Sequence, residues 1–392
     1  ANHAHGCSIG QYCHRDGCRF AAMVSILKRL VQMIREYPGS NTGGQPAMTQ
    51  KRFSLINNLR LLFLAIGMAV LWYLSGPSVM TSEEDMLWER VRSAQLQLSQ
   101  WRQQNGTATP AENDPWQCGM IGLEWSGVTT TLGDLASKRT ACNPAWAIQF
   151  MRWFNELNLE PGDHIAIYSS ASFPGLLLNA LTAAEEMQLE LLLVVSLGAS
   201  TWGANHPDAL WPAQAVELRR GGFIRKRADY YTLGAGAELG HGLSPEGEAM
   251  LRQAANAAGV ELLMAGNLEE MIALKSELLE GFQPRVFISI GGSQANLGTD
   301  EDVLKLQTGF VPANEASIAG NGVVGYAMQN GIPVIHMLNI KSISDRVGIP
   351  YDSVPRRMAH GQTGIGWSLA GLVLFFIIVF THRRWRLEPG NE

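Results

Sequence analysis

Three short loops carry the residue types best suited to binding an anion or attacking an amide. They are rich in serine, glycine and asparagine, and they occupy residues 169–173, 196–205 and 291–296. Small side chains let backbone N–H groups approach a ligand, and the N-terminus of a following helix adds unpaired donors and a partial positive charge. A carboxylate or a phosphate fits such a place. The alternative is that the small residues only permit tight turns and close packing of a strand on a helix.

The residues around the first two loops predict one strand–helix–strand unit. Apolar runs at 164–168 and 191–195 each end in a loop, and Pro174 opens an apolar segment of helical length between them. Proline suits the first helical turn, where its missing N–H costs nothing. Parallel strands place the loops that follow them on one edge of a sheet, and open α/β sheets bind ligands at that edge. We therefore expect the loops to share one edge.

Continued alternation along the chain predicts a doubly wound, mostly parallel α/β sheet with right-handed crossovers. Further strands are expected at 121–125, 230–233, 260–264, 286–290 and 334–337. Further helices are expected at 82–104, 144–157, 211–220, 245–258, 268–280 and 322–330. The helix at 82–104 is amphipathic, and Ser82 is its expected N-cap because three acidic residues follow in the first turn.

The candidate ligand-binding site combines neutral hydrogen-bond donors with two cations. The candidate donors are Ser169, Ser170, Ser172, Ser200, Asn205, Ser293 and Asn296. Lys138 and Arg139 add positive charge if the polar stretch before Asn143 folds over the same edge of the sheet. The alternative for these two residues is a solvated turn.

A serine nucleophile is the enzymatic alternative. Ser172 is the candidate because it lies just before a helix, where backbone donors stabilise an oxyanion. The candidate bases are His206, His241 and His336, and the candidate orienting carboxylates are Asp134, Asp163 and Asp208. The segment YSSASFPG departs from the G-x-S-x-G elbow of α/β-hydrolases. No complete catalytic set can therefore be assembled from the sequence.

Composition narrows the classes of partner. The chain has 392 residues, a net charge of −5 and no long basic run, which argues against nucleic acid. Near the N-terminus, three cysteines are interspersed with three histidines, but their spacing matches no common zinc pattern. These residues are Cys7, Cys13, Cys18, His3, His5 and His14. We expect neither a metal nor a cofactor.

Two apolar segments, at 55–76 and 363–381, are expected to cross a membrane. Trp72 and Tyr73 suit the interface at the end of the first segment, and no Ala-x-Ala-like cleavage site follows it, which favours an anchor over a signal peptide. Basic residues precede the first segment and follow the second. The positive-inside rule then places both termini in the cytoplasm and the intervening domain outside.

The two apolar segments and the expected topology divide the chain into regions. Residues 1–50 form an N-terminal extension, disordered or not native to the protein, and residues 80–110 form the amphipathic helix and a linker. Residues 115–355 form the extracytoplasmic α/β domain between the two transmembrane helices, and residues 382–392 form a cytoplasmic tail. An oxidising compartment permits a disulfide between Cys118 and Cys142, with two unpaired thiols as the alternative.

Four stretches resemble the poly-γ-glutamate system proteins, which are bacterial membrane proteins encoded beside the poly-γ-glutamate synthase and export components. These stretches are GVTTTLGDLASKRTACNP, SSASFPGLLLNAL, SLGASTWGANHPD and SIGGSQANLG. The resemblance runs from about Leu59 to Arg386 and leaves residues 1–47 outside. It implies a place at the plasma membrane and a role in making, exporting or processing poly-γ-glutamate. It names a pathway and not a reaction.

Two functions follow as hypotheses. In the first, the chain is a membrane-anchored component of capsule or polymer biosynthesis or export, and its α/β domain binds the anionic polymer or a synthase or export subunit. In the second, it is a surface serine-type hydrolase or transferase that acts on γ-glutamyl amide bonds. Serine-rich loops after strands are also found in sugar-isomerase domains that bind phosphosugars. An extracytoplasmic site seldom meets such ligands, so this interpretation ranks below the other two.

Overall fold

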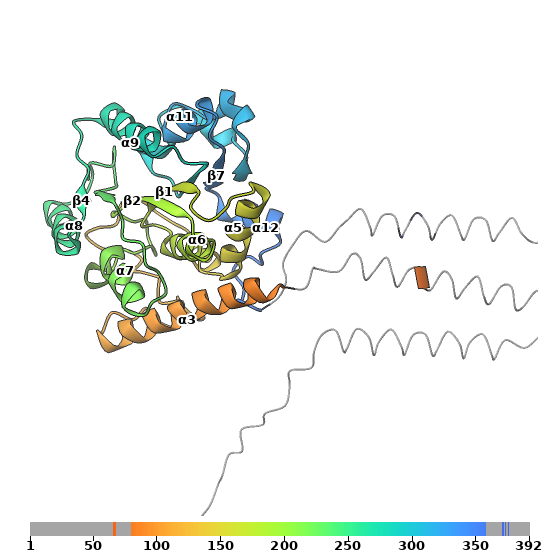
Figure 1. The fold of residues 1–392 in the computed structure, drawn as a ribbon. Coiled ribbons are helices and arrows are strands. Elements are labelled where there is room, and N and C mark those ends of the chain that lie inside the picture. The colour runs from red at the N-terminus through yellow and green to blue at the C-terminus, as the bar shows by residue number, and fades with distance from the viewer. Residues whose placement is uncertain (1–65, 68–79, 358–370, 372, 374, 376–392) are drawn as a thin grey trace, which may run out of the picture. The chain divides into compact units, whose positions relative to one another are not determined.

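The computed structural model describes residues 66–67, 80–357, 371, 373 and 375, and an α/β domain occupies residues 80–357. A seven-stranded sheet with helices on both faces forms its centre (Figure 1). The strands are β1 (His164–Ser170), β2 (Glu190–Ser196), β3 (Tyr230–Thr232), β4 (Glu261–Leu262), β5 (Val286–Ile290), β6 (Gly309–Val311) and β7 (Val334–Met337). The predicted α/β class is therefore confirmed.

The strand order is β4-β3-β2-β1-β5-β7-β6, and every neighbouring pair is parallel except β6 with β7. The chain winds outward from β1 to β4, then returns to the other side of β1 with β5. The direction of winding thus reverses between β1 and β5. In open α/β sheets the crevice at such a reversal is the usual place for a ligand.

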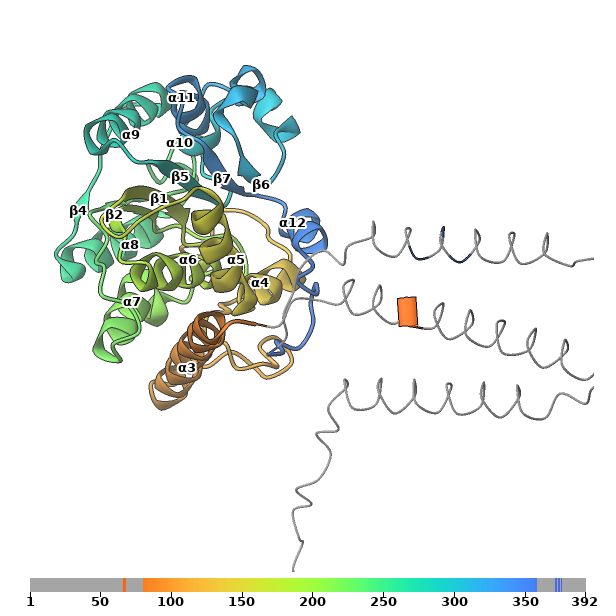
Figure 2. The same cartoon turned by 45° about the vertical axis from the view of Figure 1, so that its right-hand side comes forward.

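Helices cover both faces of the sheet (Figure 2). The helices on one side of the sheet are α4 (Leu135–Ala141), α5 (Ala145–Glu156), α6 (Pro174–Glu186), α7 (Trp211–Arg220), α8 (Pro245–Ala258) and α12 (Ile340–Val347). Helix α3 (Ser82–Gln104) packs on the outer side of α5, α6 and α7. The other face packs against α9 (Leu268–Phe282), α10 (Gln294–Leu297) and α11 (Val323–Gln329). Three short 3-10 helices complete the domain: η1 (Pro207–Ala209), η2 (Glu301–Lys305) and η3 (Ala313–Ile318).

Coverage of both faces explains why β1 and β2 are continuous apolar runs instead of alternating ones. In β1, Ile165 and Ile167 belong to the hydrophobic cluster on the α6 face, while Ala166 and Tyr168 belong to the cluster on the α9 face. All four side chains are buried. At the ends of the strands the buried residues become serines, and there the sheet starts to present polar groups.

Helix α3 is fastened to the domain and is part of its core. Its N-cap is Thr81, which forms a reciprocal capping box with Glu84, so the expected cap at Ser82 was wrong by one residue. Leu87 and Val91 are buried in the same hydrophobic cluster as α5 and α6. The buried guanidinium of Arg102 donates to the carbonyl oxygens of residues 107, 119 and 121, which holds the following loop against the helix.

Several sequence expectations need correction. Residues 121–125 form no strand; they lie beside residues 202–205, where the side chain of Asn205 bonds both the N–H and the carbonyl oxygen of Leu123 at 2.8 Å. The polar stretch before Asn143 contains helix α4 where a loop was expected. Strand β6 and helices α10 and α12 were not foreseen. Strand β6 and helix α10 are too short to show a period, and the apolar residues of α12 follow a helical period over only eight residues.

Within the described residues, no helix combines the length and apolar character needed to cross a membrane. The two segments expected to do so, 55–76 and 363–381, lie almost wholly outside the described residues. The expected N-terminal extension, 1–50, and tail, 382–392, lie outside them entirely.

Candidate functional site at the carboxyl edge of the sheet

The structure brings the three serine-rich loops together at the carboxyl ends of β1, β2 and β5. Ala171 N donates to Ser196 O at 2.8 Å, and Ala204 N donates to Ala171 O at 2.9 Å, so the first two loops share backbone hydrogen bonds. A Cβ atom on Gly291, at the start of the third loop, would lie 3.1 Å from Ser170 Cβ. The loops therefore flank the point where the direction of winding reverses.

A chain of buried serines links the first two loops. Ser170 Oγ donates to Ser172 Oγ at 2.8 Å, and Ser200 N donates to the same Ser172 oxygen at 2.9 Å. Ser172 N donates back to Ser170 Oγ at 3.1 Å. Ser172 Oγ thus accepts two hydrogen bonds. Ser169 does not join these hydrogen bonds, because its hydroxyl donates to the carbonyl oxygen of Ser170.

Lys138 reaches from α4 into this serine cluster. Its Nζ lies 2.6 Å from both Ser200 Oγ and the carbonyl oxygen of Ser172, and 3.7 Å from the centre of the Phe173 ring. Lys138 is only 3% exposed, and within residues 80–357 no carboxylate forms an ion pair with it. Burial lowers the pKa of Lys138 to about 7, although Cys142 and Asp134 act in the opposite direction. The groups in direct contact with the Lys138 ammonium are neutral oxygens and an aromatic ring, and no carboxylate among the described residues pairs with it.

The position of Lys138 follows from the sequence that begins α4. Asp134 caps the helix by accepting from Ser137 N at 2.8 Å, and Tyr351 donates to the same carboxylate at 2.5 Å. Gly133 lies so close to the second loop that a Cβ atom would meet Ser200 Oγ at 2.9 Å. The close approach at Gly133 and the cap at Asp134 place the next turn of helix, with Lys138, over the loops.

Arg139 points elsewhere. Its guanidinium forms two hydrogen bonds of 2.6 Å with the carboxylate of Asp352, and this pairing raises the pKa of Arg139. Of the two cations considered for the site, Lys138 contacts the serine-rich loops and Arg139 is committed to an ion pair.

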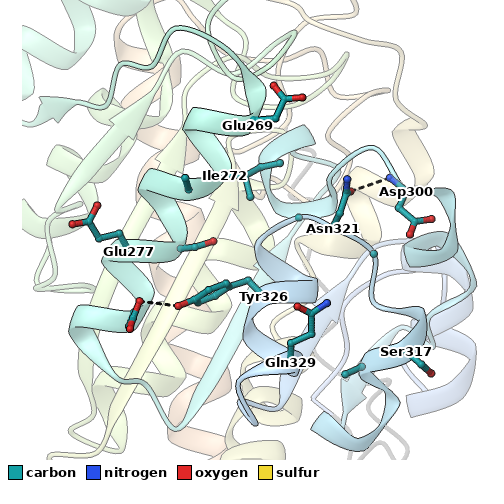
Figure 3. Close-up of a pocket in the computed structure, with 14 residues that line it drawn as sticks. Glu269, Ile272, Glu277, Asp300, Ser317, Asn321, Tyr326 and Gln329 are labelled. Carbon is teal, nitrogen blue, oxygen red and sulfur yellow. Dashed lines mark hydrogen bonds between the residues drawn. The ribbon is translucent and has the colours of Figure 1, made fainter.

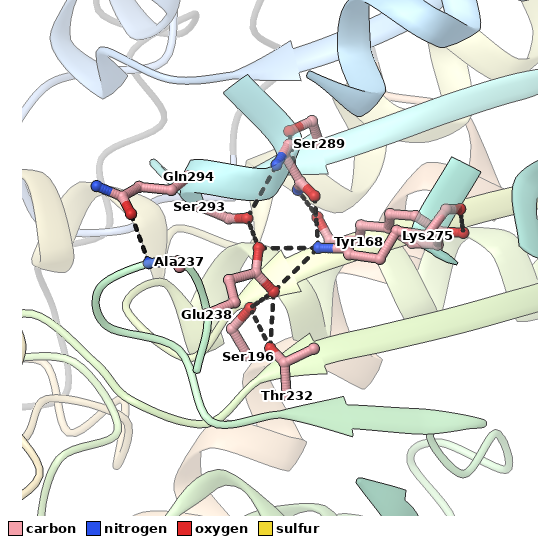
Figure 4. A network of polar contacts seen from close by, with 10 residues as sticks. Tyr168, Ser196, Thr232, Ala237, Glu238, Lys275, Ser289, Ser293 and Gln294 are labelled. Atoms are coloured by element: carbon pink, nitrogen blue, oxygen red, sulfur yellow. Dashed lines mark hydrogen bonds and ion pairs between the residues drawn. The ribbon is translucent and has the colours of Figure 1, made fainter. Parts of the chain in front are cut away.

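A second polar cluster lies beside the first on the α9 face of the sheet (Figure 4). At its centre, Lys275 Nζ lies 2.9 and 3.1 Å from the two carboxylate oxygens of Glu238, and 2.7 Å from Asn296 Oδ1. Both charged side chains are 1% exposed. Hydroxyl groups of Ser196, Thr232 and Ser293 donate to the same carboxylate. The ends of β2 and β3 and the third loop are thereby tied to one buried ion pair.

The ion pair determines the charge of Glu238. Burial acts to raise the pKa of this carboxyl group, but the Lys275 ammonium and the donated hydrogen bonds outweigh burial and hold the pKa below its usual value. Burial lowers the pKa of Lys275, and the Glu238 carboxylate opposes that shift. The side chains of Ser293 and Asn296 therefore bond to the buried Glu238–Lys275 pair. Ser293→Ala removes one hydrogen-bond donor from the Glu238 carboxylate.

Sequence reasoning missed both members of this pair, although each left a signal. Glu238 is a lone charge in the glycine-rich stretch 234–242. Lys275 follows Met271 by four residues and precedes Leu279 by four, so it lies on the apolar stripe of α9. A lysine on such a stripe requires a buried partner.

The expected serine–histidine pairing is not formed. His206 Nδ1 accepts from Asp208 N at 3.2 Å and caps η1, and His241 is exposed. His336 is buried in β7 with no hydrogen-bond partner for either ring nitrogen among the described residues, and burial lowers its pKa to about 4. Within residues 80–357, no hydrogen bond joins Ser172 to any of these histidines. Asn205 is also structural, because it holds the 121–129 segment.

Cys118 and Cys142 are free, buried thiols, so no disulfide joins them. Burial, together with the neighbouring Cys142 and Asp114, raises the pKa of Cys118 well above its usual value. In the described part of the chain, no group of three or more acidic, histidine or cysteine side chains is arranged to hold a metal ion.

No protein-family model, curated protein or solved structure matches this chain.

Proposed function

We propose that this chain is a membrane-anchored component of poly-γ-glutamate biosynthesis or export, and that its α/β domain binds the α-carboxylates of the polymer at the carboxyl edge of the sheet. The observation that carries the proposal is a buried lysine, Lys138, held over the serine-rich loops with no carboxylate partner among the described residues. The four stretches that resemble poly-γ-glutamate system proteins include all three loops and α4.

The chemistry at this edge suits a carboxylate. Protonated Lys138 supplies a charge-assisted hydrogen bond, and Ser172 and Ser200 supply hydroxyl groups. Helix α6 begins at Pro174, directly after the first loop, and runs for 13 residues, so the positive end of its dipole adds to the lysine charge. A bound anion favours the charged form of Lys138, which raises its pKa from about 7.

Removal of the lysine charge is the direct test. Full-length protein should bind defined γ-glutamyl oligomers at pH 7, and Lys138→Met should weaken binding at least about tenfold, because a hydrogen bond to a charged group contributes roughly 1.5–3 kcal/mol. Added salt should weaken binding of the wild type. Lys341→Met is the matched control, because that lysine is exposed on α12. Equal affinity in wild type and Lys138→Met would exclude this edge as the polymer site.

A second function, acyl transfer or hydrolysis at γ-glutamyl bonds, is favoured by one distance: 2.6 Å between Lys138 Nζ and Ser200 Oγ. With its pKa near 7, the amine is partly neutral and can accept the serine proton. Ser200 Oγ would then attack the γ-amide carbonyl, and Lys138 would pass the proton to the departing amine. Water or another amine would release the acyl group.

Ser200→Ala separates the two functions. This substitution removes the nucleophile and leaves the lysine charge in place. If the edge is a binding site, Ser200→Ala should retain oligomer affinity within a few-fold and leave polymer length unchanged. If the edge is catalytic, the same variant should abolish any shortening or transfer of oligomers that the wild type produces, as measured by chromatography of the reaction mixture.

The proposed setting at the membrane rests on the two apolar segments and their basic flanks. It places both termini in the cytoplasm and the α/β domain outside, where the polymer emerges. A single cysteine introduced at Asn105, which is exposed at the end of α3, should react with an impermeant thiol reagent in intact cells, because the native cysteines of the domain are buried. Labelling only after lysis would contradict this topology.

A further inference from the structure

The Lys138 site is closed in the described structure. Lys138 is 3% exposed, and Ser172 and Ser200, which contact it, are 9% and 6% exposed. Two cavities on the described domain do not reach these residues: one, of about 750 Å³, lies between α9 and α11 (Figure 3), and the other, of about 250 Å³, lies beside residues 354–355. A carboxylate that pairs with an ammonium group must come within about 3 Å of it. Part of the domain therefore has to move before a ligand reaches Lys138.

Helix α4 carries Lys138 over the serine-rich loops and is held by little apolar packing. Of its seven residues, Ala141 is the only buried apolar one, and Leu135 is partly buried against the core. In α6, which supports the first loop, every residue from Pro174 to Glu185 is buried. Segments with few buried apolar contacts open locally at a lower cost than the core does. Helix α4 is therefore the element that can open while α6 stays in place.

Polar contacts from the segment that follows α12 fasten the start of α4. We call residues 349–357 the strap. The hydroxyl of Tyr351 in the strap donates to the Asp134 carboxylate at 2.5 Å and lies 2.9 Å from Ser137 Oγ. Asp134 is the N-cap of α4, and Ser137 lies in its first turn. One phenol group thus holds the N-terminal end of α4.

The next residue of the strap fastens the other end of α4. The Asp352 carboxylate accepts two hydrogen bonds of 2.6 Å from the Arg139 guanidinium, and Asp352 N donates to Thr140 Oγ1 at 2.8 Å. Asp352 has a φ of 42°, in the left-handed region that aspartate and asparagine tolerate better than most residues. The turn at Asp352 lets two consecutive strap residues contact the two ends of one short helix.

The strap is itself anchored to elements other than α4. At its start, Ile349 is buried, and its N–H donates to the carbonyl oxygen of Ser344 in α12 at 2.9 Å. At its end, Arg357 pairs with Asp85 at 2.6 Å and with Glu89 at 2.9 Å, and both of these acids belong to α3. The strap can therefore stay in place when its contacts with α4 break.

We propose that α4 is a lid over the Lys138 site, and that the strap holds this lid shut through Tyr351 and Asp352. The inference rests on the proposed function, because it describes how a polymer carboxylate reaches Lys138. Opening of the lid breaks the hydrogen bonds from Lys138 Nζ to Ser200 Oγ and to the Ser172 carbonyl oxygen, and so exposes the amine. A carboxylate then replaces these acceptors when the lid closes again.

Acetylation of lysines in the full-length protein tests the lid without any polymer. N-hydroxysuccinimidyl acetate at pH 8 is the probe, and mass spectrometry of peptides gives the rates at Lys138, at buried Lys275 and at exposed Lys305. In the wild type, Lys138 should react far more slowly than Lys305. Tyr351→Phe/Asp352→Asn should raise the Lys138 rate at least about tenfold, because it removes a hydrogen bond to one carboxylate and the charge of the other. The rates at Lys275 and Lys305 should stay the same.

Asp345→Asn is the matched control for this double variant. It makes the same kind of substitution close to the strap, but the Asp345 carboxylate pairs with Lys341 on α12 and not with α4. It should be acetylated as the wild type is. An unchanged Lys138 rate in Tyr351→Phe/Asp352→Asn would overturn the lid. An equal rise at Lys275 would also overturn it, because the whole domain would then be opening instead of α4 alone.

The rate of oligomer association tests the link between the lid and the polymer. A ligand that needs the open state binds in proportion to the open fraction, so γ-glutamyl oligomers should associate faster with Tyr351→Phe/Asp352→Asn than with the wild type. Equal association rates would overturn the lid as a gate for the polymer. If neither protein binds oligomers while the Lys138 acetylation rate rises, the polymer assignment fails and the lid stands.

Discussion

Replacement of Lys275 by methionine is expected to lower the free energy of unfolding by about 3–5 kcal/mol. The substitution removes the ammonium group that lies 2.9 Å from Glu238 and leaves a carboxylate that is 1% exposed without a counter-charge. The loss appears as a lower midpoint in urea denaturation with an unchanged slope. It is the largest effect expected from any single substitution discussed for this domain.

The double variant Glu238→Gln/Lys275→Met tests whether the loss of stability in Lys275→Met comes from the unpaired Glu238 carboxylate. It removes both charges, and the glutamine carbonyl still accepts from the hydroxyl groups of Ser196 and Thr232. The double variant should therefore be more stable than Lys275→Met alone. Lys341→Met, which breaks an exposed pair with Asp345, should cost less than about 1 kcal/mol. A loss below about 1 kcal/mol for Lys275→Met would contradict the buried charge pair.

The free energy of unfolding of the wild type is expected to rise with pH because of Lys138, and Lys138→Met should remove this rise. Lys138 has a pKa of about 7 in the folded domain and an ordinary value of 10.5, so between these values the unfolded chain binds more protons. Stability then increases with pH. The cost of burying this lysine is fully present below pH 7 and disappears as the pH approaches 10.5. From pH 7 to 9.5, the wild type should gain roughly 3 kcal/mol relative to Lys138→Met.

Urea denaturation of both proteins at pH 7, 8 and 9.5 measures this difference. Comparison with the variant cancels contributions from other groups that titrate in the same range. The substitution also removes the hydrogen bonds to Ser200 and to the Ser172 carbonyl oxygen, but that loss does not produce the predicted upward slope. Parallel stability curves for the two proteins would mean that Lys138 keeps its charge in the folded domain.

The sequence predicted the sheet well where burial on both faces left a simple pattern. The apolar runs of β1, β2, β5 and β7 are each covered by helices on both sides, so they stand out as continuous. Helices α7 and α8 begin and end as expected, because Pro212 and Pro245 lie in their first turns and Gly221 and Gly259 follow their last residues. Strand β6 has three residues and pairs only with β7, so nothing local specified it.

The candidate site was less accessible to sequence reasoning because its contacts are formed between distant segments. The loops after β1, β2 and β5 could be grouped from topology alone. The burial of Lys138 depends on the cap at Asp134 and on the approach of Gly133 to Ser200, 67 residues along the chain from it. The Glu238–Lys275 pair joins a loop to a helix 37 residues later, and no local pattern relates them.

Proton uptake on binding tests the central claim most directly. At pH 8, free Lys138 should be mostly neutral, and a bound γ-glutamyl carboxylate should restore its charge. Calorimetric titration with γ-glutamyl oligomers in two buffers of different ionisation enthalpy measures the protons taken up. The wild type should take up more than about half a proton per site, and Lys138→Met should bind weakly with almost none. Tight binding with no proton uptake, or the same uptake in both proteins, would contradict a polymer site built around Lys138.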